Sequence, residues 1–120
     1  MPRDWRMFLQ DIAESCERIA RYSQRMTRDT LTSDDQAYDA IVRNMEIIGE
    51  ASKHIPPEIC RLMPEVEWHG LAGLRDFLAH AYFGLDDDIL WSVIQNEVPV
   101  ISSSVQTFLA SNNPSPPSSA

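Results

Sequence analysis

The helical character of this chain is clearest in residues 5–26, WRMFLQDIAESCERIARYSQRM. Steps of three and four positions place side chains on one face of an α-helix. The apolar residues of the segment follow such steps, at Trp5, Leu9, Ile12, Cys16, Ile19 and Met26. The pattern predicts an amphipathic helix over about residues 4–28, with a narrow apolar stripe that faces a core and a break at residues 30–32.

The same period continues along the chain, and no segment alternates as a strand would. Residues 33–54 repeat it at Ala37, Ile41, Met45, Ile48 and Ser52. A short turn of helix is expected over residues 57–62, between Pro56-Pro57 and Pro64. Two further helices are expected over residues 67–81 and 86–109. The sequence therefore predicts an all-α fold, an antiparallel bundle of four main helices plus one short helix.

Capping signals mark the starts of two of these helices. Ser33 with Gln36 three residues later fits a capping box. Asp86 is the expected N-cap of the last helix, and Asp87 and Asp88 suit the positive end of its dipole. Three successive carboxylates also suggest a metal site, but capping explains them more simply, and no metal is expected.

Proline and glycine predict local irregularities in the last two long helices. Pro99 is expected to kink the last helix, because it removes one backbone hydrogen bond and clashes with the preceding turn. Gly70 and Gly73 each weaken an isolated helix by about 1 kcal/mol relative to alanine. We therefore interpret these glycines as positions where another helix approaches closely.

The length of 120 residues suits one domain with a single core. We expect residues 1–110 to form that domain and residues 111–120, which are only Ser, Asn, Pro and Ala, to be a disordered tail. No apolar run approaches the roughly 18 residues that a transmembrane helix needs, and the N-terminus does not resemble a signal peptide. The protein is therefore expected to be cytoplasmic and not bound to a membrane, with Cys16 and Cys60 as free thiols.

The formal net charge of −8 argues against binding to nucleic acid, because phosphate contacts need cations. The distribution of charge weakens that objection. Arginines recur at helical spacing on one face of the first helix, at Arg18, Arg21, Arg25 and Arg28. That row is typical of a solvated helix face, and it also fits a binding surface for a nucleic-acid backbone or for an acidic partner.

Arg75, Asp76, His80 and Tyr82 stand close together in residues 73–84, GLRDFLAHAYFG. A guanidinium offers a fixed fork of donors that suits phosphate oxygens. Imidazole, with an unperturbed pKa of about 6.5, gives and takes protons near neutral pH. Arg75 and His80 are about 140° apart around a helix axis, so one ideal helix does not bring their tips together. Spacing alone also allows a surface charge and an ordinary polar side chain.

This stretch resembles the signature of the HEPN superfamily, and specifically of the HepT toxins that pair with a minimal nucleotidyltransferase antitoxin. Residues 40–51, AIVRNMEIIGEA, are similar to the second helix of that family. Trp68 before the motif and Leu90-Trp91 after it are also similar to the family. The resemblance extends from about Trp5 to Leu109.

The resemblance implies a HEPN-like homodimer whose motifs meet at a two-fold interface, and a metal-independent ribonuclease without a cofactor. In that mechanism the 2′-hydroxyl of RNA attacks the adjacent phosphorus. His80 is then the general base or acid, Arg75 stabilises charge in the transition state, and Asp76 orients one of them. Arg43, Asn44 and Glu46 are expected to support the cleft.

The family also implies a role for Tyr82, as the residue that the transferase antitoxin adenylylates to silence the toxin. A nucleotide phosphate beside Arg75 would compete with substrate phosphate for the same cations. Without the resemblance, Tyr82 is equally a half-buried tyrosine near a helix end. A non-catalytic nucleotide-binding or docking subunit of a transferase complex is the alternative function.

Overall fold

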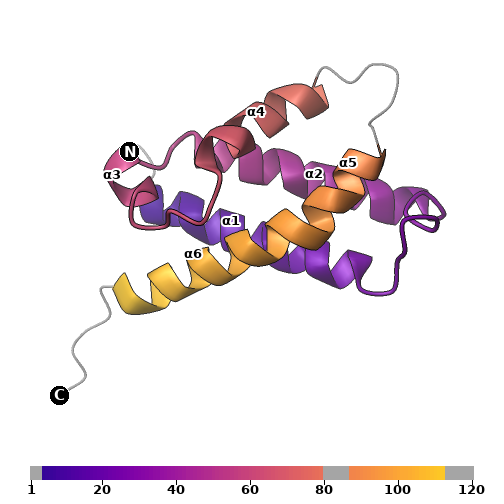
Figure 1. Ribbon diagram of the computed structural model, residues 1–120, viewed down its shortest axis with the longest axis horizontal. Coiled ribbons are helices and arrows are strands. Elements are labelled where there is room, and N and C mark those ends of the chain that lie inside the picture. Colours follow the sequence, from indigo (N-terminus) through magenta and orange to yellow (C-terminus); the bar gives the residue numbers. More distant parts are fainter. Residues whose placement is uncertain (1–3, 80–86, 113–120) are drawn as a thin grey trace.

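The computed structural model describes residues 4–79 and 87–112, with only the backbone described for residues 75–79 and 112 (Figure 1). Every regular element in these residues is helical, which confirms the all-α prediction. In chain order the elements are α1 (Trp5–Ser23), α2 (Asp35–Ser52), α3 (Pro57–Cys60), α4 (Trp68–Ala79), α5 (Asp87–Ser92), the π-helical turn η1 (Val93–Glu97) and α6 (Val98–Asn112). The expected tail therefore begins no earlier than residue 113, and residues 113–120 lie outside the described residues.

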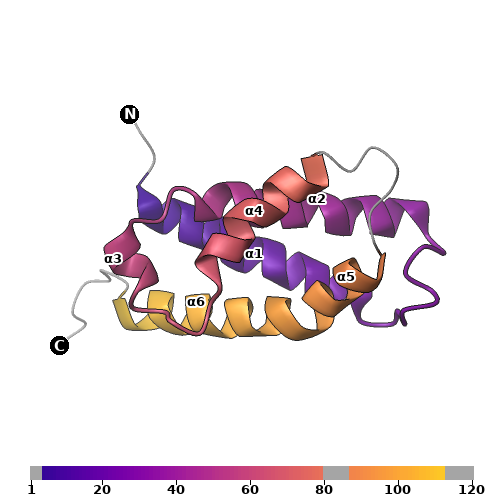
Figure 2. The same ribbon diagram turned by 45° about the horizontal axis from the view of Figure 1, so that its top comes forward.

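Helix α1 is the centre of the bundle. It packs against α2 on one side and α6 on another, and α2 also packs against α4 (Figure 2). Four members of its predicted apolar stripe have no exposed surface: Leu9, Ile12, Cys16 and Ile19. The two ends of the stripe, Trp5 and Met26, are partly buried against this core. Each Å² of apolar surface that is removed from water stabilises the fold by about 25 cal/mol. These buried interfaces are therefore the main source of stability.

The loop between α1 and α2 begins earlier than predicted. Helix α1 ends at Ser23, whose hydroxyl donates to the Ile19 carbonyl oxygen at 2.7 Å. Beyond it, Thr27 and Thr30 bond to each other's backbone and side-chain atoms, with the Thr27 amide 2.7 Å from the Thr30 hydroxyl oxygen. Side-chain bonds of this kind offer the backbone an alternative to a helix.

The predicted N-cap of α2 is wrong by one residue. Asp34, not Ser33, caps the helix, since its Oδ1 accepts the backbone N–H groups of Gln36 at 3.0 Å and Ala37 at 3.2 Å. A charged carboxylate also complements the positive end of the helix dipole better than a hydroxyl does. Either neighbour fits the sequence pattern, so the pattern alone could not separate them.

The interruption expected from Pro99 takes the form of a π-helical turn just before it. Within η1, the N–H of Val98 donates to the carbonyl of Val93, five residues earlier. Pro99 has no N–H to offer in the α-helical register, and a wider turn accommodates that loss. Both cysteines are free thiols, as expected, and burial raises the pKa of Cys16 to about 12.

The interpretation of Gly70 and Gly73 as sites of close helix approach is wrong for the single chain. A Cβ at Gly73 would meet no atom within 4 Å, and one at Gly70 would meet only the Cβ of Glu67, at 3.9 Å. Both glycines are exposed on α4. Glycine permits a close approach, but none of the described helices makes one here.

Candidate active site

The predicted motif begins in the second half of α4 and continues beyond the described residues. Arg75 and Asp76 lie on the helical backbone of α4, which ends in the structure at Ala79. His80 and Tyr82 lie outside the described residues, as does the expected N-cap Asp86. The structure therefore describes α4, on which the motif begins, and α5, which starts three residues after the motif ends.

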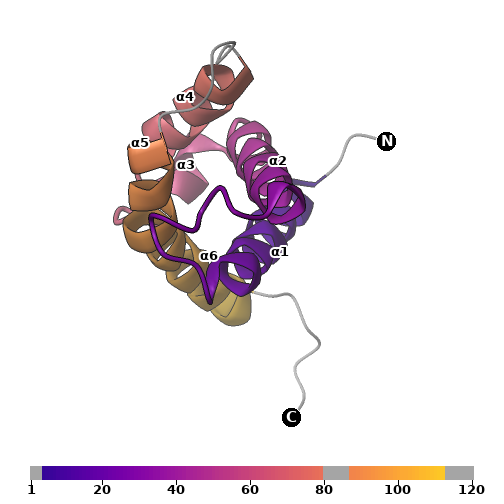
Figure 3. The same ribbon diagram turned by 90° about the vertical axis from the view of Figure 1, so that its right-hand side faces the viewer.

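The α4 end of this segment is held by packing against α2. Leu71 is buried and Leu74 half-buried on the face that faces the core. At the start of α4, the indole N–H of Trp68 donates to the Met63 carbonyl oxygen at 3.2 Å. Seen end on, α4 lies beside α2 with α5 on its other side (Figure 3). These contacts fix the helix that carries Arg75 relative to α2.

The α5 end is held by two polar contacts to distant parts of the chain. The Tyr38 hydroxyl donates to Asp87 Oδ1 at 2.7 Å, and Arg28 Nε donates to Asp88 Oδ1 at 2.5 Å. Burial, followed by the bond to Asp87, raises the pKa of Tyr38 to about 12. The bond to Asp88 likewise raises the pKa of Arg28. Tyr38 therefore holds the start of α5, a role that no local sequence signal indicated.

The two aspartates thus have partners as well as a place at the helix start. Among the side chains that the structure describes, in residues 4–74 and 87–111, no three of His, Cys, Asp or Glu gather as a metal site would require. The predicted N-cap, Asp86, lies outside the described part. For Asp87 and Asp88, the observed partners are Tyr38 and Arg28.

The three residues predicted to support the cleft occupy different environments on α2. Arg43 and Glu46 line one groove of about 430 Å³, together with Ile47 and Glu50. Asn44 is instead buried, with its Nδ2 donating to the Ala40 carbonyl oxygen at 2.7 Å. Within the described residues its Oδ1 has no hydrogen-bond partner. Leaving such an acceptor unpaired costs about 1–3 kcal/mol. Asn44 therefore lies on the buried side of α2 and does not line the groove of Arg43 and Glu46.

Comparison with known proteins places this architecture in a family. Residues 12–108 match the family described as Ribonuclease HepT-like. The chain belongs to this family. The protein named "Probable ribonuclease HepT" from Thermococcus cleftensis is 40% identical over 99 residues, which cover 82% of this chain and 90% of that protein. A candidate RNase of Methanocaldococcus jannaschii is 41% identical over 100 residues, covering 82% of this chain and 83% of that protein. No solved structure gives a significant match.

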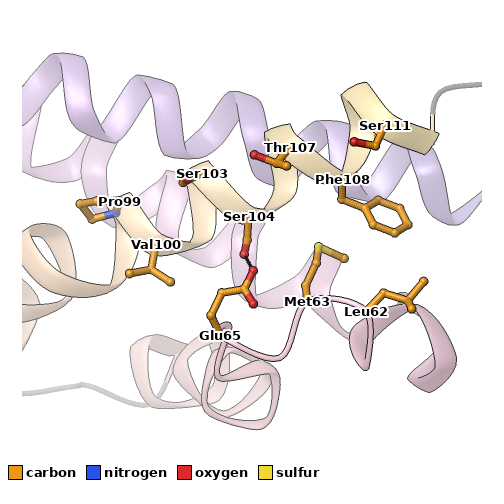
Figure 4. A pocket seen from close by; sticks show the side chains of 10 residues that line it. All are labelled: Leu62, Met63, Glu65, Pro99, Val100, Ser103, Ser104, Thr107, Phe108 and Ser111. Carbon is orange, nitrogen blue, oxygen red and sulfur yellow. Dashed lines mark hydrogen bonds between the residues drawn. The ribbon is translucent and has the colours of Figure 1, made fainter.

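The HepT-like domain has another groove, shown from close by in Figure 4. It has a volume of about 560 Å³ and lies between the α3–α4 link and α6. Leu62, 61% exposed, and Val100, 40% exposed, border it. Across it, the Ser104 hydroxyl donates to Glu65. This groove contains no predicted functional residue, so the motif is not part of it.

The described helices also bear on membrane association. None of them combines the length and the apolar content that spanning a bilayer requires.

Proposed function

We propose that this chain is the toxin component of a type VII-like toxin–antitoxin pair and that it cleaves RNA in the cytoplasm without a metal ion. One observation carries the proposal. Arg75, His80 and Tyr82 stand in the order and spacing of the HepT signature, inside a chain that matches the HepT-like family over residues 12–108. The names of the relatives from Thermococcus cleftensis and Methanocaldococcus jannaschii support a ribonuclease.

The reaction uses groups that the motif supplies. His80 takes the proton of a 2′-hydroxyl, or returns one to the leaving oxygen, near neutral pH. The 2′-oxygen bonds to the adjacent phosphorus, and the bond from phosphorus to the 5′-oxygen breaks. Arg75 stabilises the negative charge that builds up on the phosphoryl oxygens, and Asp76 orients His80 or Arg75. The products are a 2′,3′-cyclic phosphate and a 5′-hydroxyl, and only RNA can react in this way.

A homodimer would complete the site. Arg75 and His80 are about 140° apart on one helix, so either the long Arg75 side chain reaches round or a second copy completes the site. The resemblance to HEPN proteins favours the second copy. The free face of α4 supports this step. Among the described residues and outside the backbone of α4, a Cβ at Gly73 would meet no atom within 4 Å, and one at Gly70 only the Cβ of Glu67. A groove of about 320 Å³ lies beside them, lined by Leu71, Leu74 and Val93 among others.

Silencing would act through Tyr82. A nucleotidyltransferase antitoxin would attach adenylyl groups to its hydroxyl, which places phosphate charge near Arg75 and blocks the substrate. Arg43 and Glu46, which share a groove on α2, would support the cleft or the transferase's approach.

The test is incubation of untagged protein, verified by mass to be unmodified at Tyr82, with total RNA in the presence of EDTA. Wild type is expected to cleave, and Arg75→Ala and His80→Ala are expected to lose about 10²-fold or more in rate. The cut ends should carry 2′,3′-cyclic phosphate. Absence of cleavage by wild type, with the transferase still bound by Arg75→Ala and His80→Ala, would favour a non-catalytic docking subunit.

The composite site has its own test. Arg75→Ala and His80→Ala proteins are mixed under conditions that exchange subunits. If residues of both copies form each site, the mixed dimer regains one complete site and part of the wild-type rate. If each chain forms its own site, the mixture stays as inactive as its components.

A further inference from the structure

The outward face of α6 carries no charged side chain. Residues 98–112 contain no Asp, Glu, Lys or Arg. Exposed residues of the helix lie within an arc of about 100° around its axis, at Pro99, Ser103, Gln106, Thr107 and Ala110. Figure 2 shows α6 along one edge of the bundle, where its main packing neighbour is α1 on the inner side. The uncharged arc therefore faces away from the core.

The outward faces of the two other long helices are charged. The hollow on α1 is lined by Glu14, Glu17, Arg18 and Arg21. The hollow on α2 is lined by Arg43, Glu46, Ile47 and Glu50. Helix faces that meet only solvent usually carry charged and polar residues in this way. The face of α6 departs from that pattern within the same molecule, which indicates that it meets something other than water.

Two grooves flank the outward face of α6. One has a volume of about 560 Å³ and lies beside the α3–α4 link, and the other has about 600 Å³ and lies beside the end of α1. Pro99 and Ser103 line both grooves, so they form part of the ridge between them. Among the described residues that line these grooves, Glu65 alone is charged, and it already accepts a hydrogen bond from Ser104. The ridge and its two grooves thus form one nearly uncharged surface.

The groove beside the α3–α4 link has exposed apolar residues at both of its ends. Val100 borders one end, and Leu62 borders the other end near Phe108 (Figure 4). A two-fold axis across the middle of α6 would bring a second α6 against the first in the antiparallel direction. Val100 of each copy would then lie over the Leu62 end of the other copy's groove. The surface is therefore complementary to itself, and pairing would remove apolar side chains from water.

We propose that the outward face of α6, with the groove that Leu62 borders, binds a second copy of this chain in a contact separate from the free face of α4. Copies with a net charge of −8 repel each other. On the α6 face they can meet without placing like charges together. A basic partner would find only Glu65 there, already bonded to Ser104. The charge distribution thus favours a second copy over a charged partner, whether or not the chain cleaves RNA.

The test adds one carboxylate to each of two exposed helix faces. Thr107→Glu places it in the middle of the α6 face, and Gln10→Glu places it on the exposed side of α1 as the matched control. Neither site is buried, and glutamate favours a helix more than threonine does, so both variants should fold. Thr107→Glu is expected to raise the dissociation constant of the contact by about tenfold or more, because like charges would face each other across the two-fold axis. Sedimentation equilibrium should show the mass of the wild-type particle halved by Thr107→Glu and unchanged by Gln10→Glu.

A second pair of variants tests the apolar ends of the groove. Leu62→Gln removes the exposed apolar side chain beside Phe108, and Met7→Gln removes one from the exposed side of α1. Only Leu62→Gln is expected to weaken the association. Mixing Thr107→Glu with Thr107→Lys should restore the wild-type mass, because opposite charges then meet across the contact.

Two results would overturn the proposal. One is an equal mass for wild type, Thr107→Glu and Gln10→Glu. The other is a different protein that binds wild type and not Thr107→Glu while the chain itself does not associate, which would assign the face to that partner.

RNA cleavage in EDTA keeps this contact apart from the proposed ribonuclease site. Thr107→Glu is expected to cleave like wild type, because the α6 face shares no residue with the motif. If Thr107→Glu both halves the mass and abolishes cleavage, the α6 contact is the one that completes the active site, and a separate contact is ruled out. If wild type cleaves no RNA but Thr107→Glu still halves the mass, the α6 contact stands and the ribonuclease proposal fails.

Discussion

Helices α1 and α4 differ in how much of their surface the bundle covers. Two helices, α2 and α6, pack against α1, whereas the main neighbour of α4 is α2. Helix α1 buries six residues: Leu9, Ile12, Ser15, Cys16, Ile19 and Ser23. Among the described side chains of α4, only Leu71 is buried.

The difference separates the part of the molecule that maintains the fold from the part that carries the motif. A helix covered on several sides contributes most of the apolar burial and tolerates little change. A helix covered mainly on one side can present its other faces to a second subunit or to a substrate. Elements with few buried contacts also open more easily than the core. The motif therefore begins on a helix whose described side chains are less buried than those of α1.

The strongest test of this contrast truncates the same residue type in both helices. Leu9→Ala, at a fully buried position of α1, is expected to lower the free energy of unfolding by about 3–4 kcal/mol. Leu74→Ala, at a half-buried position of α4, is expected to cost about 1–2 kcal/mol, because less apolar surface and a smaller cavity are involved. Urea unfolding of both variants measures the difference. Equal losses would mean that α4 belongs to the core as fully as α1 does.

The second test breaks the contact that holds the start of α5 against α2. Tyr38→Phe removes the donor to Asp87 and is expected to cost about 1 kcal/mol. Tyr22→Phe, at an exposed ring, is the matched control and should be neutral. Amide hydrogen exchange should quicken in α5 of Tyr38→Phe, while the α1 core keeps its protection. A uniform increase in exchange across α1 and α5 would contradict a local role.

The same tyrosine predicts a change of stability with pH. Its pKa rises from the ordinary value of 10.0 to about 12 in the folded protein, chiefly through burial and then through the bond to Asp87. The folded state therefore holds the phenolic proton more tightly than the unfolded state. This contribution to stability is complete below pH 10.0 and is lost as the pH rises to about 12. Phenolate absorbance, compared between wild type and Tyr38→Phe, should locate the late titration.

The bundle could be predicted because its information is local and periodic. Steps of three and four in α1 and α2 identified residues that are buried, including Leu9, Ile12, Ile41 and Ile48. The predictions are wrong where two neighbouring residues fit the same rule, or where a residue allows a contact without requiring it. Ser33 and Asp34 both fit a helix start, and Gly73 permits a contact that no described helix makes.

The surroundings of the candidate site were less predictable, because its contacts join distant parts of the chain. The bond between Tyr38 and Asp87 spans 49 positions, and the one between Arg28 and Asp88 spans 60. No periodic pattern relates such residues. The sequence indicated the motif from residue types that suit phosphate chemistry, whereas the supports of the motif segment emerged only from the fold. The roles of His80 and Tyr82 stay predictions.

The smallest expected effect tests the free face of α4 directly. Gly73→Ala adds a Cβ where no atom lies within 4 Å, and alanine favours a helix over glycine by up to about 1 kcal/mol. The variant should therefore raise the free energy of unfolding of the subunit by about 0.5–1 kcal/mol, and Gly70→Ala should behave similarly. Urea unfolding at protein concentrations low enough to keep the chain monomeric measures this. A loss of stability there would mean that this face of α4 is packed within the subunit and is not free. If the same face joins a second copy, sedimentation should show that Gly73→Ala weakens the dimer while it stabilises the subunit. Opposite signs in the two measurements would place the glycine at an interface between subunits, because only a contact outside the chain can penalise a side chain that the chain itself accommodates.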